Sequence, residues 1–414
     1  MRVRSVLTTI LCAGLGVACR GAHDAITMGA EWQAVPVTRI GSIDDPEQGL
    51  TQIGQIVIGP DGLFYVSQPL NRNVRVYDAR GALRRVIGKE GEGPGEFEGI
   101  ASIGLLRDTL YVSDDQLLRV SFFTLDGAFL TSRPWRTDQR LTRSHGTSSS
   151  GPLDIMYIPT APQALSVDGT ALVIPQHGMP VLTERGPGVR TWSYPIPVLR
   201  IDQQSQVIDT LAWEQHMAAN IVMSRGGAEF FFAAHLFDYP LLKLMPDGSG
   251  VVVVDRRAAA DRATSTFRVS ATRRARDTIF SPVFAYQPVP TTREVVRSVL
   301  ERTPINQNPG SPASGSPPGV PEREDALRDA GLVPSMLPPV TYLTVGQDSS
   351  IWLRREEVSG DSAVWNVLGS SGEAVGTLRL PSRQTVVAAK GDVVAATELD
   401  DLDVPYVIRY RIRR

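Results

Sequence analysis

The stretch Ile53-Gly-Gln-Ile-Val-Ile58, followed by Pro60-Asp61-Gly62 and Leu63-Phe-Tyr-Val-Ser67, decides the fold. Two further runs follow it, Val74-Arg-Val-Tyr-Asp78 and Leu83-Arg-Arg-Val-Ile87, with a turn at Gly81 between them. Short runs rich in β-branched and aromatic residues, bounded by Gly, Pro and Asp, are typical of strands joined in hairpins. Residues 53–87 therefore predict one four-stranded β unit.

The same rhythm recurs along the chain, and a fixed period of strands and turns is the signature of a repeat fold. Further units are predicted at residues 102–134, 164–213, 241–280, 341–380 and 385–412. The sixth unit has only three strands, whereas Val35–Ile40 resembles a fourth strand without a unit of its own. A closed ring protects its edges, so we predict an all-β, six-bladed β-propeller in which residues near 38 pair with residues near 409.

A resemblance supports this fold. The loop Gly88-Lys-Glu-Gly-Glu-Gly-Pro-Gly-Glu-Phe97 follows the first unit and resembles the NHL-repeat family, in particular bacterial exported six-bladed propellers. The resemblance is specific over residues 54–130 and diffuse beyond them. It implies a propeller with a central channel and a binding role, although the family also contains enzymes.

Composition narrows the function classes. The chain of 414 residues has 42 Lys and Arg against 44 Asp and Glu, a formal net charge of −2. Bulk charge therefore does not favour nucleic acid as a partner. Hydrophobic residues make up 42% and charged residues 21%, as in folded proteins. We expect a monomer.

The first residues predict export. Arg2 and Arg4 precede an apolar run that is too short to span a bilayer, so residues 1–18 are interpreted as a signal peptide. Residues 15–18 before Cys19 resemble the bacterial lipobox, except that Gly16 stands where Leu is usual. We predict lipidation at Cys19, a tether over 19–33 and a location in the cell envelope, with the membrane contacted only through that anchor; cleavage after Ala18 without lipidation is the alternative.

One segment, 288–338, breaks the strand pattern within the predicted propeller of residues 34–414. Residues 291–302 carry apolar residues at helical spacing after a Thr cap, and 321–331 begin with Pro and end with Gly. The stretch between them is rich in Pro, Gly and Ser. We predict a helical insertion between blades four and five that covers one face of the ring, with a domain boundary as the alternative.

Candidate binding residues come from loops that propeller geometry gathers on one face, because loops on a rigid scaffold commonly carry function. Arg72, Asn73 and Arg354 belong to this set. The aromatic stretch 230–240, predicted to enter the first strand of unit four, adds His235, Asp238 and Tyr239. The non-functional alternatives are a solvated surface of mixed charge for the loops and packing between blades for the aromatic stretch.

Four histidines are predicted on loops of this same face: His145, His177, His216 and His235. Converging imidazoles are able to bind a divalent metal that activates water. No short metal-binding spacing supports this, and scattered surface histidines are the competing interpretation.

The sequence contains no G-x-S-x-G elbow, H-E-x-x-H motif or P-loop lysine. It therefore favours a non-catalytic module that binds an envelope protein or a small ligand. The alternative is a metal-dependent hydrolase or lyase with the histidines and Asp238 as ligands.

Overall fold

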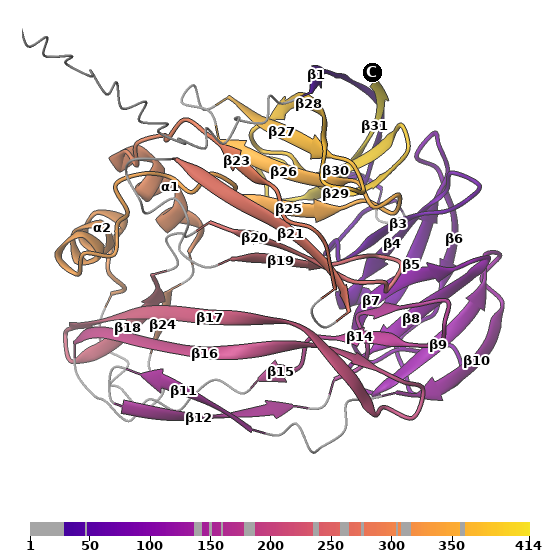
Figure 1. Ribbon diagram of the computed structural model, residues 1–414, viewed down its shortest axis with the longest axis horizontal. Coiled ribbons are helices and arrows are strands. Elements are labelled where there is room, and N and C mark those ends of the chain that lie inside the picture. The colour runs from indigo at the N-terminus through magenta and orange to yellow at the C-terminus, as the bar shows by residue number, and fades with distance from the viewer. Residues whose placement is uncertain are drawn as a thin grey trace, which may run out of the picture.

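A computed structural model describes residues 29–45, 48–135, 143–148, 151–158, 160–177, 187–234, 240–256, 265–274, 277–303, 305–307, 316–356 and 361–414. Their strands form six sheets arranged as blades around a common axis (Figure 1). The fold is the predicted all-β propeller.

Blades one and two follow the sequence pattern closely. Their strands run from the innermost outward, as the order of each sheet shows. Blade one comprises β3 (Ile56–Ile58), β4 (Phe64–Gln68), β5 (Asn73–Tyr77) and β6 (Leu83–Ile87), with a short 3₁₀ helix at Pro69–Asn71. Blade two comprises β7 (Ile100–Leu106), β8 (Thr109–Asp114), β9 (Arg119–Thr124) and β10 (Phe129–Pro134).

Blades four, five and six also match the predicted units. Blade four contains β19 (Leu241–Leu244), β20 (Val251–Asp255), β21 (Thr266–Arg274), β22 (Asp277–Phe280) and β23 (Val283–Ala285). Blade five contains β25 (Tyr342–Val345), β26 (Ile351–Glu356), β27 (Ser362–Leu368) and β28 (Ala374–Pro381). Blade six contains β29 (Thr385–Lys390), β30 (Val393–Leu399) and β31 (Pro405–Arg413).

The ring closes as predicted. The N-terminal strand β2 (Gln33–Ile40) is antiparallel to β31 and completes blade six, with Thr38 opposite Arg409. Just before it, the two-residue strand β1 (Ala30–Glu31) pairs in parallel with β28 of blade five. Trp32, between these two strands, is 6% exposed and packs against Trp352. The N-terminal segment thus fastens blade five to blade six.

The core lies between blades, because each sheet is too small to bury a face by itself. Tyr65, Val76 and Ile87 of blade one pack against Ile103 and Leu110 of blade two, and comparable clusters join the other neighbours. Burial of apolar surface between sheets contributes roughly 25 cal/mol per Å².

Blade three departs from the predicted unit. Its inner strands β13 (Ala164–Leu165) and β14 (Ala171–Val173) are short, but β16 (Gly188–Ile201) and β17 (Val207–Arg225) continue far beyond the end of β14. There they are joined by β11 (Arg143–Ser148), β12 (Gly151–Ile158), β15 (Gln176–His177), β18 (Ala228–Ala233) and β24 (Ile305–Gln307). We call this projecting part the extension sheet (Figure 1).

Two expectations are wrong here. Residues 230–233 belong to β18, which pairs with β17, and are not the approach to the first strand of blade four. The predicted unit three also stopped its last strand at Trp213, whereas β17 runs on to Arg225. The reason is that Ala219, Ile221 and Met223 alternate toward a partner surface contributed by residues far along the chain.

That partner surface is the helical insertion. Helix α1 (Arg293–Arg302) begins after Thr292, whose Oγ1 accepts a hydrogen bond from the Val295 amide, and α2 (Val320–Asp329) has Pro321 in its first turn. Val296, Leu300 and Leu327 pack on Ile221 and Phe232. The insertion therefore packs on the extension sheet. The prediction had placed it over one face of the ring. The base of the insertion is closed by a bridge between Pro290 and Met336.

Within the described residues, none of the helices has the length and apolar character needed to cross a membrane.

Candidate functional site: the central channel

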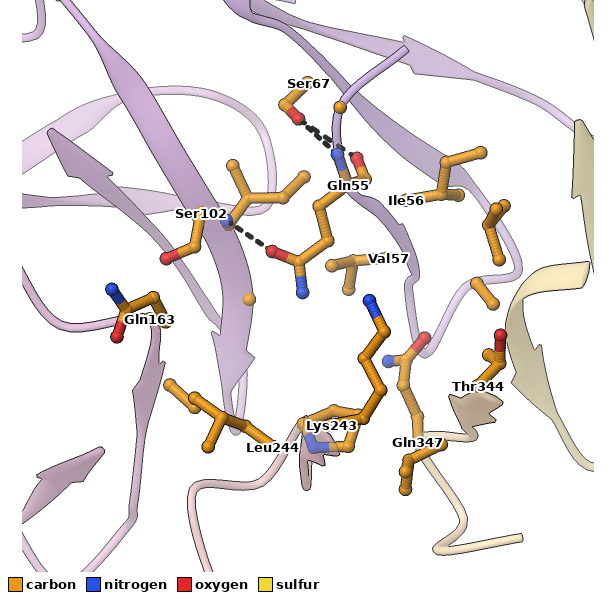
Figure 2. A pocket seen from close by; sticks show the side chains of 18 of the residues that line it. Gln55, Ile56, Val57, Ser67, Ser102, Gln163, Lys243, Leu244, Thr344 and Gln347 are labelled. Carbon is orange, nitrogen blue, oxygen red and sulfur yellow. Dashed lines mark hydrogen bonds between the residues drawn. The ribbon is translucent and has the colours of Figure 1, made fainter. Parts of the chain in front are cut away.

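The first strands of all six blades surround one cavity of about 500 Å³ (Figure 2). Its lining includes residues of β3, β7, β13, β19, β25 and β29. Because each blade contributes its innermost strand, the cavity is the central channel that the resemblance implied. Its volume lies in the range of small-molecule sites.

Most polar side chains of the channel form hydrogen bonds with backbone groups. Gln347 accepts from the Ile58 amide at 2.7 Å and donates to the Ile58 carbonyl at 3.0 Å. Gln163 does the same with Ile174. Ser102 donates to Pro162 of blade three, and Thr344 donates to Val386 of blade six. These groups hold blades and loops together and have little capacity left for a ligand.

Gln55 is different from the other two glutamines. Its Oε1 accepts a hydrogen bond of 3.0 Å from the Ile103 amide, which orients the side chain so that Nε2 is left without a partner among the described residues. Its own backbone is held by Ser67, whose Oγ accepts from the Gln55 amide at 2.7 Å. Figure 2 shows the Gln55 amide nitrogen directed into the cavity.

Lys243 is the second unoccupied donor. It projects from β19 into the channel (Figure 2), and no described carboxylate lies within ion-pair distance of its Nζ. Asp247 also lines the cavity, but its Oδ1 accepts from the Ser249 amide at 3.0 Å. Nζ lies over the ring face of Tyr342, 5.7 Å from the ring centroid. A cation in this position is attracted only weakly.

Desolvation lowers the pKa of Lys243 and raises the pKa of Tyr342, because the channel walls replace bulk water around both groups. Lys243 is nevertheless exposed to solvent. The sequence has three lysines among its 42 basic residues. A lysine without a carboxylate partner, placed inside a cavity, is a functional-site candidate.

The predicted loop residues Arg72 and Asn73 lie beside the Gly88–Phe97 loop. Arg72, in a left-handed conformation with φ of 50°, donates through Nε to the Glu98 carbonyl and pairs with Glu90 at 2.9 Å. Asn73 begins β5, and its Oδ1 is buried without a hydrogen bond. Arg119 of blade two also donates to this loop, at the Glu92, Gly93 and Glu96 carbonyls.

These contacts indicate that the Gly88–Phe97 loop has a structural role between blades one and two. Phe97 is fully buried between blades one and two, and its ring lies where a Cβ on Gly88 would be. Arg354, another predicted binding residue, donates to the Ser382 carbonyl at 2.6 Å and thereby holds the connection between blades five and six. Binding roles for Arg72, Asn73 and Arg354 remain predictions.

His235, Asp238 and Tyr239 lie outside the described residues. The other three histidines lie in strands and not in loops: His145 in β11, His177 in β15 and His216 in β17. Their segments were assigned to loops because the extension sheet was not predicted. His145 pairs with Asp154 at 3.0 Å, and the His216 ring packs on Tyr194 at 4.9 Å.

Among the residues that the structure describes, no three or more His, Cys, Asp or Glu side chains form a group able to hold a metal ion. A metal site that includes His235 stays a prediction.

Sequence reasoning missed Lys243 and Gln55. The scarcity of lysine was one available signal, and the position of Gln55 just before an innermost strand was another. Neither shows which glutamine keeps a free amide, because that depends on contacts between blades.

The family comparison agrees with this architecture. The model of the DUF5128 family, described as a 6-bladed beta-propeller, matches residues 46–136. No curated protein sequence matches the chain. Among solved structures, it is similar to a member of the DUF4221 family from Bacteroides vulgatus, with 10% identity, a TM-score of 0.43 and coverage of 95% of this chain and 99% of the other.

Two further solved structures are similar to the chain at a comparable level of identity, TM-score and coverage. A Bacteroides fragilis protein described as exported has 11% identity, a TM-score of 0.39 and coverage of 93% and 95%. A gluconolactonase from Xanthomonas campestris has 11% identity, a TM-score of 0.36 and coverage of 93% and 98%. By its own sheet topology and the family match to residues 46–136, the chain is a six-bladed β-propeller.

Proposed function

We propose that the protein is a non-catalytic binding module whose central channel takes a small anionic ligand. The observation that carries the proposal is the pair of unoccupied donors, Lys243 Nζ and Gln55 Nε2, in a cavity where the other glutamine and hydroxyl groups described above serve the backbone. A carboxylate or phosphate would supply the acceptor that both donors lack.

The electrostatics favour an anion over a neutral ligand. Desolvation lowers the pKa of Lys243, and no described carboxylate lies within ion-pair distance of its ammonium group. A bound anion would restore the missing partner and raise the pKa of Lys243. The ligand would also contact apolar channel residues such as Val57 and Leu244, which is the usual composition of a small-molecule site.

Calorimetry with citrate, inorganic phosphate and acetate as probe anions tests the proposal. We expect at least one anion to bind the native protein, and Lys243→Met to weaken it about tenfold or more through loss of a charge-assisted hydrogen bond. Lys243→Arg is the matched control, because it keeps the charge. Equal binding by the native protein and Lys243→Met, or binding of none of the three anions, would contradict the channel as an anion site.

We also propose that the protein is exported and held in the envelope by a lipid on Cys19, on the strength of Arg2, Arg4 and residues 15–18. Metabolic labelling with a palmitate analogue tests this: the native chain should incorporate label, and Cys19→Ala should not. Release of a mature chain that begins at Cys19 without label would support simple cleavage after Ala18.

A further inference from the structure

A second cavity, separate from the channel, lies between blades two and three. It has a volume of about 410 Å³ and is lined by the Leu106–Thr109 turn, by β10, by the Leu165–Gly169 turn and by Gln203. We call it the inter-blade groove. Trp135 and Leu165 are buried at its wall, 5% and 1% exposed.

The groove is apolar and open to solvent. Leu130 is 52% exposed and Val167 is 67% exposed, although both line a concave surface where burial is available. Most other blade contacts of the ring bury their apolar side chains almost completely. Adjacent exposed apolar side chains in a cavity are typical of a binding surface and not of an ordinary blade contact.

Two cations lie at the same groove. Arg107 and Arg133 line it and are exposed, and neither has a hydrogen bond or ion pair from its guanidinium to another described residue. By contrast, Arg72, Arg84, Arg85 and Arg119 in the neighbouring blades have such partners. An apolar cavity with unpaired guanidinium groups matches a ligand with an aliphatic chain and an anionic head.

We propose that the inter-blade groove binds a monomeric long-chain carboxylate, with the alkyl chain against Leu130, Trp135 and Val167 and the carboxylate at Arg107 and Arg133. The volume lies within the range of small-molecule sites. Transfer of each methylene from water would drive binding, and the guanidinium groups would orient the chain. The site does not depend on the proposed anion site at Lys243.

Dodecanoate below its micellar concentration is the probe. We expect saturable binding by calorimetry, accompanied by a change in Trp135 fluorescence that Trp135→Phe abolishes. Arg107→Ala with Arg133→Ala should weaken binding about tenfold or more, and dodecanol should bind the native protein correspondingly less. Leu130→Asp should also remove binding, and because Leu130 is exposed this variant should fold normally.

Arg80→Ala is the matched control, because Arg80 is an exposed arginine of blade one whose side chain has no partner among the described residues. Lys243→Met should leave dodecanoate binding unchanged, which separates the two sites. Dodecanoate binding that survives the double arginine change and Leu130→Asp would overturn the proposal. So would binding only to anionic phospholipid vesicles, or a dimer that Leu130→Asp dissociates, since then a membrane or a second copy covers the groove.

Discussion

The ring of blades and the extension sheet with its two helices are built by different means. In blades one, two, five and six consecutive strands pair with one another, and only the N-terminal strands β1 and β2 come from far away in the sequence. The extension sheet is covered by α1 and α2, which follow β17 in the sequence only after the whole of blade four. Because strands of the ring pair with their sequence neighbours, the ring can be predicted from the sequence. The extension sheet depends on long-range packing and cannot.

The largest expected effect breaks the ring. Deletion of residues 30–40 would expose β31 as an edge and remove Trp32 from its contact with Trp352. We expect loss of cooperative unfolding and aggregation, measured by thermal denaturation and gel filtration. Val37→Thr, at an exposed position of the same strand, should behave as the native protein. A deleted chain that melts like the native protein would mean that closure does not hold the ring.

The second prediction separates the two regions. Phe232 of β18 is fully buried against the helices, so Phe232→Ala should lower the free energy of unfolding by about 3–5 kcal/mol. Because that loss is local, we expect faster hydrogen exchange in α1, α2 and β18 with little change in blades one and two. Trp213→Ala, at a 62% exposed position of β17, is the control. Uniformly faster exchange across all blades would show that extension and ring unfold as one unit.

The third prediction concerns the contact between the two helices. Glu324 of α2 is 1% exposed and pairs with Arg297 of α1 at 2.7 Å and with Arg328 at 3.0 Å, beneath arginines that are themselves accessible. Hydrogen bonds from Arg297 and Arg328 lower the pKa of Glu324. Glu324→Gln should cost about 1–3 kcal/mol within the insertion.

The lowered pKa fixes the sign of the pH dependence. The stabilising contribution of Glu324 is fully present above the ordinary carboxyl pKa and is lost as the pH falls through the lowered folded-state value. Limited proteolysis of the insertion should therefore accelerate in acid for the native protein and less so for Glu324→Gln. Glu301→Gln, at an exposed position of α1, is the control; an identical acid response in native protein and Glu324→Gln would refute the assignment.

The smallest effect is expected in the channel. Since Lys243 has no described ion-pair partner, Lys243→Met should leave the free energy of unfolding unchanged or raise it by less than about 1 kcal/mol, because channel water still screens the charge. The lowered pKa means that the folded state disfavours the ammonium below that pKa, and this penalty disappears as the pH rises through the ordinary lysine pKa. The native protein and the variant should thus converge in stability at alkaline pH, measured by urea denaturation. A destabilised variant would indicate a structural lysine.

The site was far less predictable than the fold. The pairing of Thr38 with Arg409 follows from counting strands, since a three-stranded last unit and an unpaired first strand have one economical solution. Arg72 directly precedes β5 and Arg354 lies within β26, and the guanidinium groups of both hold neighbouring loops. Nothing in the sequence distinguishes Gln55, whose Nε2 has no partner among the described residues, from Gln347, whose side-chain amide both accepts and donates a hydrogen bond.

By itself the sequence determined the strand rhythm, the turns and the closure of the ring, because residue alternation and Gly- or Asp-containing turns act over a few neighbouring positions. Tertiary structure alone decided that β16 and β17 continue beyond their blade and that the inserted helices cover them. It also decided that Lys243 Nζ and Gln55 Nε2 face one cavity with no acceptor among the described residues. Each of these depends on which distant groups meet and on which hydrogen bonds remain unmade when they do.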